Sequence, residues 1–505
     1  MKELSRGTYF AALLVVSGLL LSAPIAVGQN GTQAKAASAP ATAKAPAQAQ
    51  PWKKIAIPPL HDFKPQQPKR IELANGLVIF MQEDHELPFI NGRILIRGGS
   101  REEPAAKVGL VTMYGQAWRN GTSDTLDAEI ERKAASIETS GGPDNTSVEW
   151  SSFKQDFDSV FGETVDLLLH PPFKAAMLEF SQRQMNTEIA RRNDDPGEIA
   201  GRESTKLVYG AESPYARQAE YATVDAVTLD DLKAWHDRSV VANNMIVSVE
   251  GDFDSAEMEV KLRKAFEPLA RGAGIQPAKI DFPGPKPGVY FVDKEDVNQS
   301  SVEIVGLGTE RSNPDYYALS VMNEVFSGGF GSRVVQYVRT KLGLAYDVGG
   351  SFGADYDHPG IFRSEAGTKS ASTVAATKAV LEEIGRLKTK PPTPAELNKA
   401  KDDVLNSFIF RYDTPEKVLN EQVTLAFYGY PPDFLEKYRD GIARVTAADV
   451  TRVANKYIDV SKLAILVVGN KNEIKPPLST LGTVTDLDIT IPPAKAGQPS
   501  AGSEQ

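Results

Sequence analysis

Residues Val227–Leu232 read VTLDDL and lead to Met245–Gly251, MIVSVEG, while residues Val445–Val450 read VTAADV and lead to Ala464–Gly469, AILVVG. In each copy the threonine precedes the final glycine by 23 positions, 228 to 251 and 446 to 469. Threonine is a favourable helix N-cap, and the apolar, β-branched run after each helix predicts a buried strand. The repeat therefore predicts a duplicated α+β unit.

A second repeated element supports the duplication. Leu169–Pro172 (LHPP) and Thr389–Pro392 (TKPP) each precede a predicted long helix, and their offset of 220 positions nearly equals the 218 of the first pair. Each half is also expected to open with two strands, which are Leu77–Met81 and Asn91–Ile96 in the first and Val289–Val292 and Ser301–Gly306 in the second.

Length and composition divide the chain further. Its 505 residues suit two or more domains rather than one core. Residues 30–51 are nearly all Ala, Pro, Gln, Thr, Ser and Lys and predict a tether, and four prolines within Ala273–Pro287 predict a linker. The predicted division is a signal peptide (1–28), a tether (29–65), an N-terminal domain (66–272), a linker (273–287), a C-terminal domain (288–475) and a tail (476–505) with one short strand at Asp486–Ile491.

The N-terminus has the features of a secretory signal. Lys2 and Arg6 make a basic start, Tyr9–Leu21 is apolar, and Ala26–Gly28 offers small residues for cleavage before Gln29. A longer apolar stretch would instead make an uncleaved anchor. We expect an exported, periplasmic protein that meets a membrane only if this segment stays uncleaved.

Charge and residue usage exclude several kinds of site. The formal net charge of −10 argues against nucleic-acid binding, and the absence of cysteine excludes disulfides and thiolate chemistry. No two of the five histidines lie three to five positions apart: His61, His85, His170, His236 and His358. His236 is expected to be structural, and the loop with Asp355, Asp357 and His358 either binds a cation loosely or forms a solvated turn.

Ser327–Tyr346, SGGFGSRVVQYVRTKLGLAY, is the segment with the strongest functional signal. A glycine-rich loop is followed by Ser332 at a possible N-cap, an apolar helical spacing, and Gly343 as a helix stop. This order brings two strong hydrogen-bond donors, Arg339 and Tyr346, to one end of a helix–strand unit. The alternative is a surface arginine in a salt bridge and a half-buried strand tyrosine.

Together with Val305–Phe326, VGLGTERSNPDYYALSVMNEVF, this segment resembles the C-terminal domain of the pitrilysin/insulinase zinc metallopeptidases, the inverzincins, which include the mitochondrial processing peptidases. The resemblance extends over roughly residues 70–475. It implies an α+β fold of two duplicated domains, each a mostly antiparallel sheet covered by helices. It also implies that Arg339 and Tyr346, in an R-x-x-x-G-L-A-Y pattern, hold the substrate carbonyl and the developing oxyanion.

The zinc motif of that family, His-x-x-Glu-His, is degenerate here. The corresponding stretch is Gly109–Thr122, in which Thr112 and Gln116 stand at the histidine positions and Gly115 at the position of the general base. Threonine and glutamine are poor zinc ligands, and glycine has no side chain. We therefore expect no metal in this chain.

Glu188 matches the position of the third zinc ligand of the family, 72 positions after Gln116. One carboxylate does not hold zinc, so the alternative is a solvated helix glutamate or a partner for Arg191 or Arg192.

The resemblance implies a non-catalytic subunit of an exported heterodimeric zinc peptidase. Arg339 and Tyr346 would act in trans on peptide substrates, at the zinc site of a homologous partner, and the chain would be inactive alone. An edge strand at Thr146–Phe153 would hold the peptide backbone. The alternative is a catalytically inactive structural or peptide-binding protein with the same fold.

Overall fold

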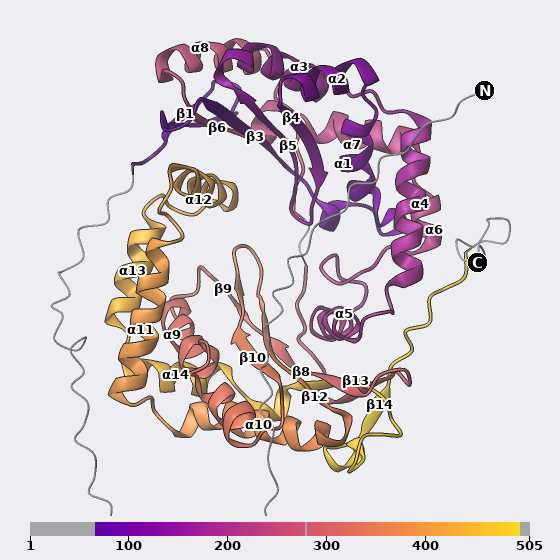
Figure 1. Ribbon diagram of the computed structural model, residues 1–505, viewed down its shortest axis with the longest axis vertical. Coiled ribbons are helices and arrows are strands. Elements are labelled where there is room, and N and C mark those ends of the chain that lie inside the picture. Colours follow the sequence, from indigo (N-terminus) through magenta and orange to yellow (C-terminus); the bar gives the residue numbers. More distant parts are fainter. Residues whose placement is uncertain (1–65, 278–279, 495–505) are drawn as a thin grey trace, which may run out of the picture. The chain divides into compact units, whose positions relative to one another are not determined.

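The computed structural model describes residues 66–277 and 280–494 (Figure 1). The predicted signal peptide and the tether, up to residue 65, lie outside the described residues, as do two linker positions, 278–279, and the end of the tail. The described residues of both halves form one compact unit, so the predicted domain limits remain predictions. No helix among these residues has the length and apolar character needed to cross a membrane.

The first half builds a mixed six-stranded sheet in the order β1-β2-β6-β3-β5-β4. Its strands are β1 (Lys69–Glu72), β2 (Val78–Glu83), β3 (Phe89–Arg97), β4 (Ser136–Gly141), β5 (Asn145–Phe153) and β6 (Met245–Gly251). β2 and β6 run parallel, and every other neighbouring pair is antiparallel.

The second half repeats this arrangement in the order β14-β7-β13-β8-β12-β10, except that its edge strand β14 runs parallel to β7. Its strands are β7 (Gly288–Asp293), β8 (Gln299–Leu307), β10 (Asp347–Phe352), β12 (Ile361–Lys369), β13 (Ala464–Gly469) and β14 (Val484–Asp486), with a separate parallel pair, β9 (Thr309–Glu310) and β11 (Ala354–Asp355). β7 and β13 are parallel as β2 and β6 are, which confirms the predicted duplication and the α+β class.

Each half also contributes helices, most of which pack on the outer side of its own sheet. In the first half they are α1 (Leu110–Asn120), α2 (Asp124–Arg132), α3 (Phe157–Leu169), α4 (Ala175–Arg191), α5 (Pro196–Tyr209), α6 (Tyr221–Asp225), α7 (Leu229–Ser239) and α8 (Ser255–Phe266). In the second they are α9 (Tyr316–Ser327), α10 (Thr373–Thr389), α11 (Pro394–Ile409), α12 (Pro415–Tyr428), α13 (Phe434–Arg444) and α14 (Ala447–Tyr457). As predicted, Thr228 and Thr446 cap α7 and α14, each in a capping box with an aspartate.

Two helices are exchanged between the halves and lie on the inner faces of the sheets (Figure 1). α12, from the second half, packs on the first sheet, and α5, from the first half, packs on the second. The contacts of α12 are made by Leu419, Val423 and Phe427 against Phe80, Leu95 and Ile246. The exchange buries apolar area from both halves in common, so each sheet depends on a helix from the other half.

A polar cluster adds a second connection between the halves. Arg101 is only 7% exposed, donates to both carboxylate oxygens of Asp357, and lies 3.0 Å from a carboxylate oxygen of Asp144. The Arg101 guanidinium and a hydrogen bond from His358 lower the pKa of Asp357 to about 2 despite its burial. Asp357 is therefore one side of an ion pair between the halves and not a loose cation ligand, and it lies in a turn where its side chain stays partly exposed.

The tail strand is shorter and earlier than predicted. β14 ends at Asp486, after which the Leu487 amide donates to the carbonyl of Phe291. Ile489 then packs on the cluster between α5 and the second sheet, and Ile491 packs on the core of the first half. The alternating apolar residues of Asp486–Ile491 predicted a strand. They instead belong to a segment whose isoleucines contact two different hydrophobic clusters.

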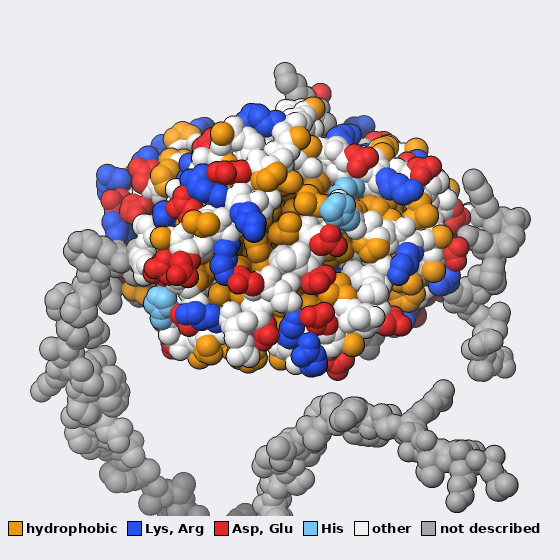
Figure 2. All heavy atoms as spheres, turned by 90° about the horizontal axis from the view of Figure 1, so that it is seen from above, with side chains coloured by type: hydrophobic (Ala, Val, Ile, Leu, Met, Phe, Trp, Pro, Cys, Tyr) orange, Lys and Arg blue, Asp and Glu red, His pale blue; other side chains and the backbone are white. Residues whose placement is uncertain are grey.

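The outer side of the first half carries charges of both signs. Figure 2 shows Lys and Arg side chains interspersed with Asp and Glu on the face that is uppermost in Figure 1, with apolar side chains between them. Two of the large apolar side chains exposed on this half are Phe180 on α4 and Val260 on α8.

His236 generates a prediction about pH and stability. Its ring is buried, lies 3.0 Å from the Tyr114 hydroxyl, and packs edge-on against Trp118, as a structural histidine does. Burial lowers its pKa from 6.5 to about 4. Below pH 6.5 His236 is therefore protonated in the unfolded chain but stays neutral in the folded chain. The free energy of unfolding falls by up to about 3 kcal/mol as the pH approaches 4.

Urea denaturation at several pH values between 7.5 and 4.5 measures this loss. The variant His236→Gln, which keeps a partner for Tyr114, is expected to lose stability less steeply over the same interval. Parallel pH profiles for the two proteins would contradict the assignment.

Candidate functional site

The degenerate zinc motif lies on α1, where that helix approaches the backbone of β4. Gly115 faces the strand: a Cβ added there would lie 2.2 Å from the amide nitrogen of Gly141 and 2.5 Å from the carbonyl carbon of Ser140. The Thr139 hydroxyl donates to the carbonyl of Gly115 at 2.6 Å. The position that the general base of a zinc peptidase would occupy is thus filled by strand backbone, and no side chain fits there without a shift of the sheet.

The neighbouring motif positions do not fit a zinc ion. Thr112 and Gln116 are partly buried one turn apart, and the Oε1 atom of Gln116 is buried without a hydrogen-bond partner among the described residues. A hydroxyl and an amide are weak ligands for zinc, which prefers imidazole, thiolate and carboxylate. Within residues 66–277 and 280–494, no group of three or more His, Asp and Glu side chains is arranged to hold a metal.

Glu188 is a solvent-exposed residue of α4. Its carboxylate lies 3.5 Å from the Nε2 atom of Gln184 on the same helix. The predicted pairing of Glu188 with Arg191 or Arg192 is wrong, because Arg191 pairs with Asp194 and Arg192 pairs with Glu220.

Arg339 lies on a π-helix, Val335–Lys341, that replaces the predicted α-helical turn. Gly343 ends it at φ +62°, as predicted, with its amide donating to the carbonyl of Arg339. Ser332 does not cap it, since its hydroxyl donates back to the carbonyl of Gly329. The Arg339 side chain is exposed and stacks 5.2 Å from the ring centre of Phe330, and no described acidic side chain pairs with it.

Tyr346 precedes β10 and is 64% exposed, so it is not the half-buried strand residue of the alternative interpretation. Its amide donates to the carbonyl of Gly367 on β12. Its ring lies directly on that glycine, where an added Cβ would approach ring atoms to 2.7 Å. The missing side chain at Gly367 thus leaves the space in which the phenol lies.

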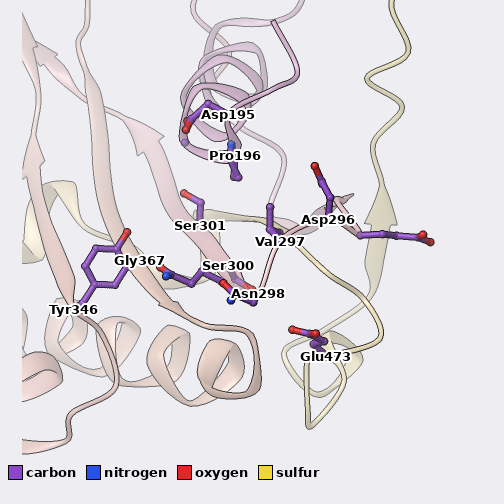
Figure 3. A pocket seen from close by; sticks show the side chains of 13 residues that line it. Asp195, Pro196, Asp296, Val297, Asn298, Ser300, Ser301, Tyr346, Gly367 and Glu473 are labelled. Atoms are coloured by element: carbon purple, nitrogen blue, oxygen red, sulfur yellow. The ribbon is translucent and has the colours of Figure 1, made fainter. Parts of the chain in front are cut away.

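The phenol of Tyr346 lines a pocket of about 700 Å³ (Figure 3). The pocket is formed by the start of α5, the turn between β7 and β8, and the loop after β13, and its lining includes four acidic residues but no Lys or Arg: Asp195, Glu295, Asp296 and Glu473. The arrangement favours cationic and hydrogen-bond-donating groups of a ligand. Arg339 does not line this pocket, so the structure places only one of the two predicted donors in it.

The acidic lining could not be predicted from the sequence. Its residues come from segments that are up to 278 positions apart, 195 to 473, and no local motif connects them. The repeat gives only an indirect indication of this pocket. The turn between β7 and β8 lies next to α5, a helix from the other half, and this position is not visible in the sequence.

The predicted peptide-binding edge strand is wrong. Thr146–Phe153 belongs to β5, which pairs with β3 on one side and β4 on the other. The edge strand on this side of the sheet is β4, which is shorter and exposes Glu138 and Ser140. Aromatic and β-branched residues favoured β5 as a strand, but these are features of an interior strand, whereas edges are short and polar.

The contact between α1 and β4 predicts the effect of Gly115→Ala. The added methyl group forces helix and strand apart, so we expect a loss of about 1–3 kcal/mol in the free energy of unfolding. Gly162→Ala in α3 is the matched control: nothing lies within 4 Å of its added Cβ, and it should be neutral or stabilising by about 0.5–1 kcal/mol. Equal stability of the two variants in urea denaturation would show that the contact is not tight.

Comparisons with known proteins find relatives over most of this chain. The family described as "Peptidase M16 inactive domain" matches residues 226–404. The non-peptidase homolog YmxG of Helicobacter pylori is 24% identical over 417 residues, which cover 81% of this chain and 95% of that protein. An uncharacterized zinc protease of Rickettsia felis is 24% identical over 402 residues, 76% of this chain and 93% of the relative.

Solved structures share the fold. A peptidase M16 inactive domain from Pseudomonas fluorescens superposes with a TM-score of 0.73 at 24% identity, covering 82% of this chain and 100% of that one. A chain of complex III2 from Candida albicans superposes with a TM-score of 0.64 at 14% identity, covering 79% of this chain and 95% of that one. In its duplicated sheets and over these matches, the chain is similar to the M16, pitrilysin-type, peptidases, and its residues 226–404 match the model of their inactive domain.

Proposed function

We propose that this protein is the non-catalytic subunit of an exported heterodimeric zinc peptidase and supplies Arg339 and Tyr346 to the site of a zinc-bearing homologue. The observation that carries the proposal is the contrast between two regions of the chain. The backbone of β4 fills the place of a general base at Gly115, whereas Arg339 and Tyr346 are exposed and have no acidic partner among the described residues.

The chemistry of the two side chains suits peptide hydrolysis in trans. The phenol of Tyr346 donates a hydrogen bond to the scissile carbonyl, and the guanidinium of Arg339 offsets the negative charge that develops on its oxygen. The zinc of the partner would supply an activated water. Both donors belong to the short segment between Val335 and Asp347, so a substrate bound across a subunit interface can reach them together.

The acidic pocket beside Tyr346 indicates which peptides are favoured. Carboxylates on its walls stabilise basic side chains or a free amino terminus and repel acidic ones. The pocket would bind the part of the substrate next to the scissile bond, while the zinc site of the partner would cleave that bond.

A second candidate function is a structural or peptide-binding role without catalysis. The observation in its favour is the structural similarity to a chain of complex III2, an assembly from Candida albicans. On this account Arg339 and Phe330 form a contact surface and Tyr346 takes no part in proton or charge transfer. Affinity purification separates the two: recovery of a zinc peptidase of similar length supports the first, and recovery of a membrane assembly supports the second.

The proposal predicts the activity of the reconstituted pair. The isolated chain is expected to bind no stoichiometric zinc and to cleave no peptide. The pair formed with its His-x-x-Glu-His partner is expected to bind zinc and to cleave peptides. Arg339→Ala or Tyr346→Phe in this chain is expected to lower kcat of the pair about 10²–10³-fold, the effect of removing one oxyanion donor.

Matched controls lie on the same helix. Lys341→Ala removes an exposed cation that stacks on Tyr337, and Tyr337→Phe removes a hydroxyl that donates to Glu382; both should leave kcat unchanged. Hydrolysis by the isolated chain, or full activity of the pair with Arg339 and Tyr346 both replaced, would refute the proposal.

A further inference from the structure

Arg97 is a cation for which the described residues provide no anion. It ends β3 on the inner face of the first sheet and is half-buried against α12. Its Nη2 atom lies 3.4 Å from the carbonyl oxygen of Ala426, and its guanidinium stacks 4.5 Å from the ring centre of Phe427. Two nearby arginines differ, since Arg93 pairs with Glu149 and Arg101 with two aspartates.

Leaving this charge unpaired costs free energy. Burial lowers the pKa of Arg97, and the one ionisable group that opposes this effect is the phenol of Tyr428. The carboxylate that Tyr428 contacts, Asp144, already accepts from that hydroxyl and pairs with Arg101. Desolvated cations in proteins are normally paired, so an unpaired one beside a cavity indicates an anion from outside the chain.

A pocket of about 480 Å³ opens beside the guanidinium, between the first sheet and α12. Its walls are largely apolar and include Phe80 on β2, Ile246 on β6 and Leu425 on α12. The volume lies within the range of about 300–1,000 Å³ that is typical of ligand sites.

The other polar side chains of this pocket already have partners. Arg70 pairs with Glu72, the Nε2 atom of Gln422 donates to the carbonyl of Pro432, and the Tyr430 hydroxyl donates to the carbonyl of Tyr356. Arg97 is thus the charged group of the lining that has no counter-ion among the described residues.

We propose that this pocket binds a carboxylate attached to an apolar body, with the carboxylate on Arg97 and the apolar part against Phe80, Ile246 and Leu425. The planar guanidinium suits bidentate binding of a carboxylate. Two sources share this chemistry, a medium-chain fatty acid and the free C-terminus of a peptide that ends in an apolar residue. The site uses neither Arg339 nor Tyr346, so the inference does not depend on the proposed function.

Isothermal titration calorimetry of the full chain tests the site with sodium octanoate and with N-acetyl-leucyl-leucine. At least one is expected to bind saturably at one site per chain, and octanol and the C-terminal amide of the peptide are expected to bind at least about tenfold more weakly. The probe that binds more tightly identifies the source.

Variants separate a ligand role from a structural one. Arg97→Met should weaken binding about 10–100-fold, Arg97→Lys less, and Arg132→Gln, which removes an exposed cation of α2 outside the lining, should have no effect. Because Arg97→Met removes an unpaired charge, its thermal midpoint without ligand should equal or exceed that of the wild type. Failure of both probes to bind at millimolar concentration, or unchanged binding by Arg97→Met, would overturn the inference.

Discussion

The close approach of α1 to β4 constrains the rest of this structure. Gly115 and Gly141 allow helix and strand backbones to come together, and an added Cβ at either one would lie within 2.2 Å of the facing backbone. In an active zinc peptidase the same helix must carry a glutamate and two imidazoles beside a water. Here the space for the glutamate is gone, so the motif differs in its packing as well as in its ligand positions.

The exchange of α5 and α12 determines where the remaining pockets lie. Each helix covers the inner face of a sheet that belongs to the other half, and a pocket opens beside each. The one next to α5 is lined by carboxylates and the phenol of Tyr346, whereas the one next to α12 is apolar and carries Arg97. The chain thus has two pockets of opposite charge, suited to different chemical groups.

Much of the fold follows from local signals in the sequence. Thr228 and Thr446 cap their helices as predicted, and the apolar runs after them form the central parallel strands. The edge strand was mispredicted, because β-propensity favours β5 and tertiary pairing alone decides which strand is outermost. The degenerate motif and the roles of Arg339 and Tyr346 were predicted from the resemblance to a known family, not from spacing alone. The filled space at Gly115, the acidic pocket and the unpaired Arg97 depend on contacts between distant segments, which no local pattern reports.

The central claim is that Tyr346 faces the zinc site of another chain. Photo-crosslinking with benzoylphenylalanine in place of Tyr346, and in place of the exposed Val260 on α8 as a control, tests it in the assembled pair. The account predicts a crosslink from position 346 to the partner helix that carries His-x-x-Glu-His, and none from position 260. Crosslinks from position 346 only within its own chain, in a sample where the pair has formed, would contradict it.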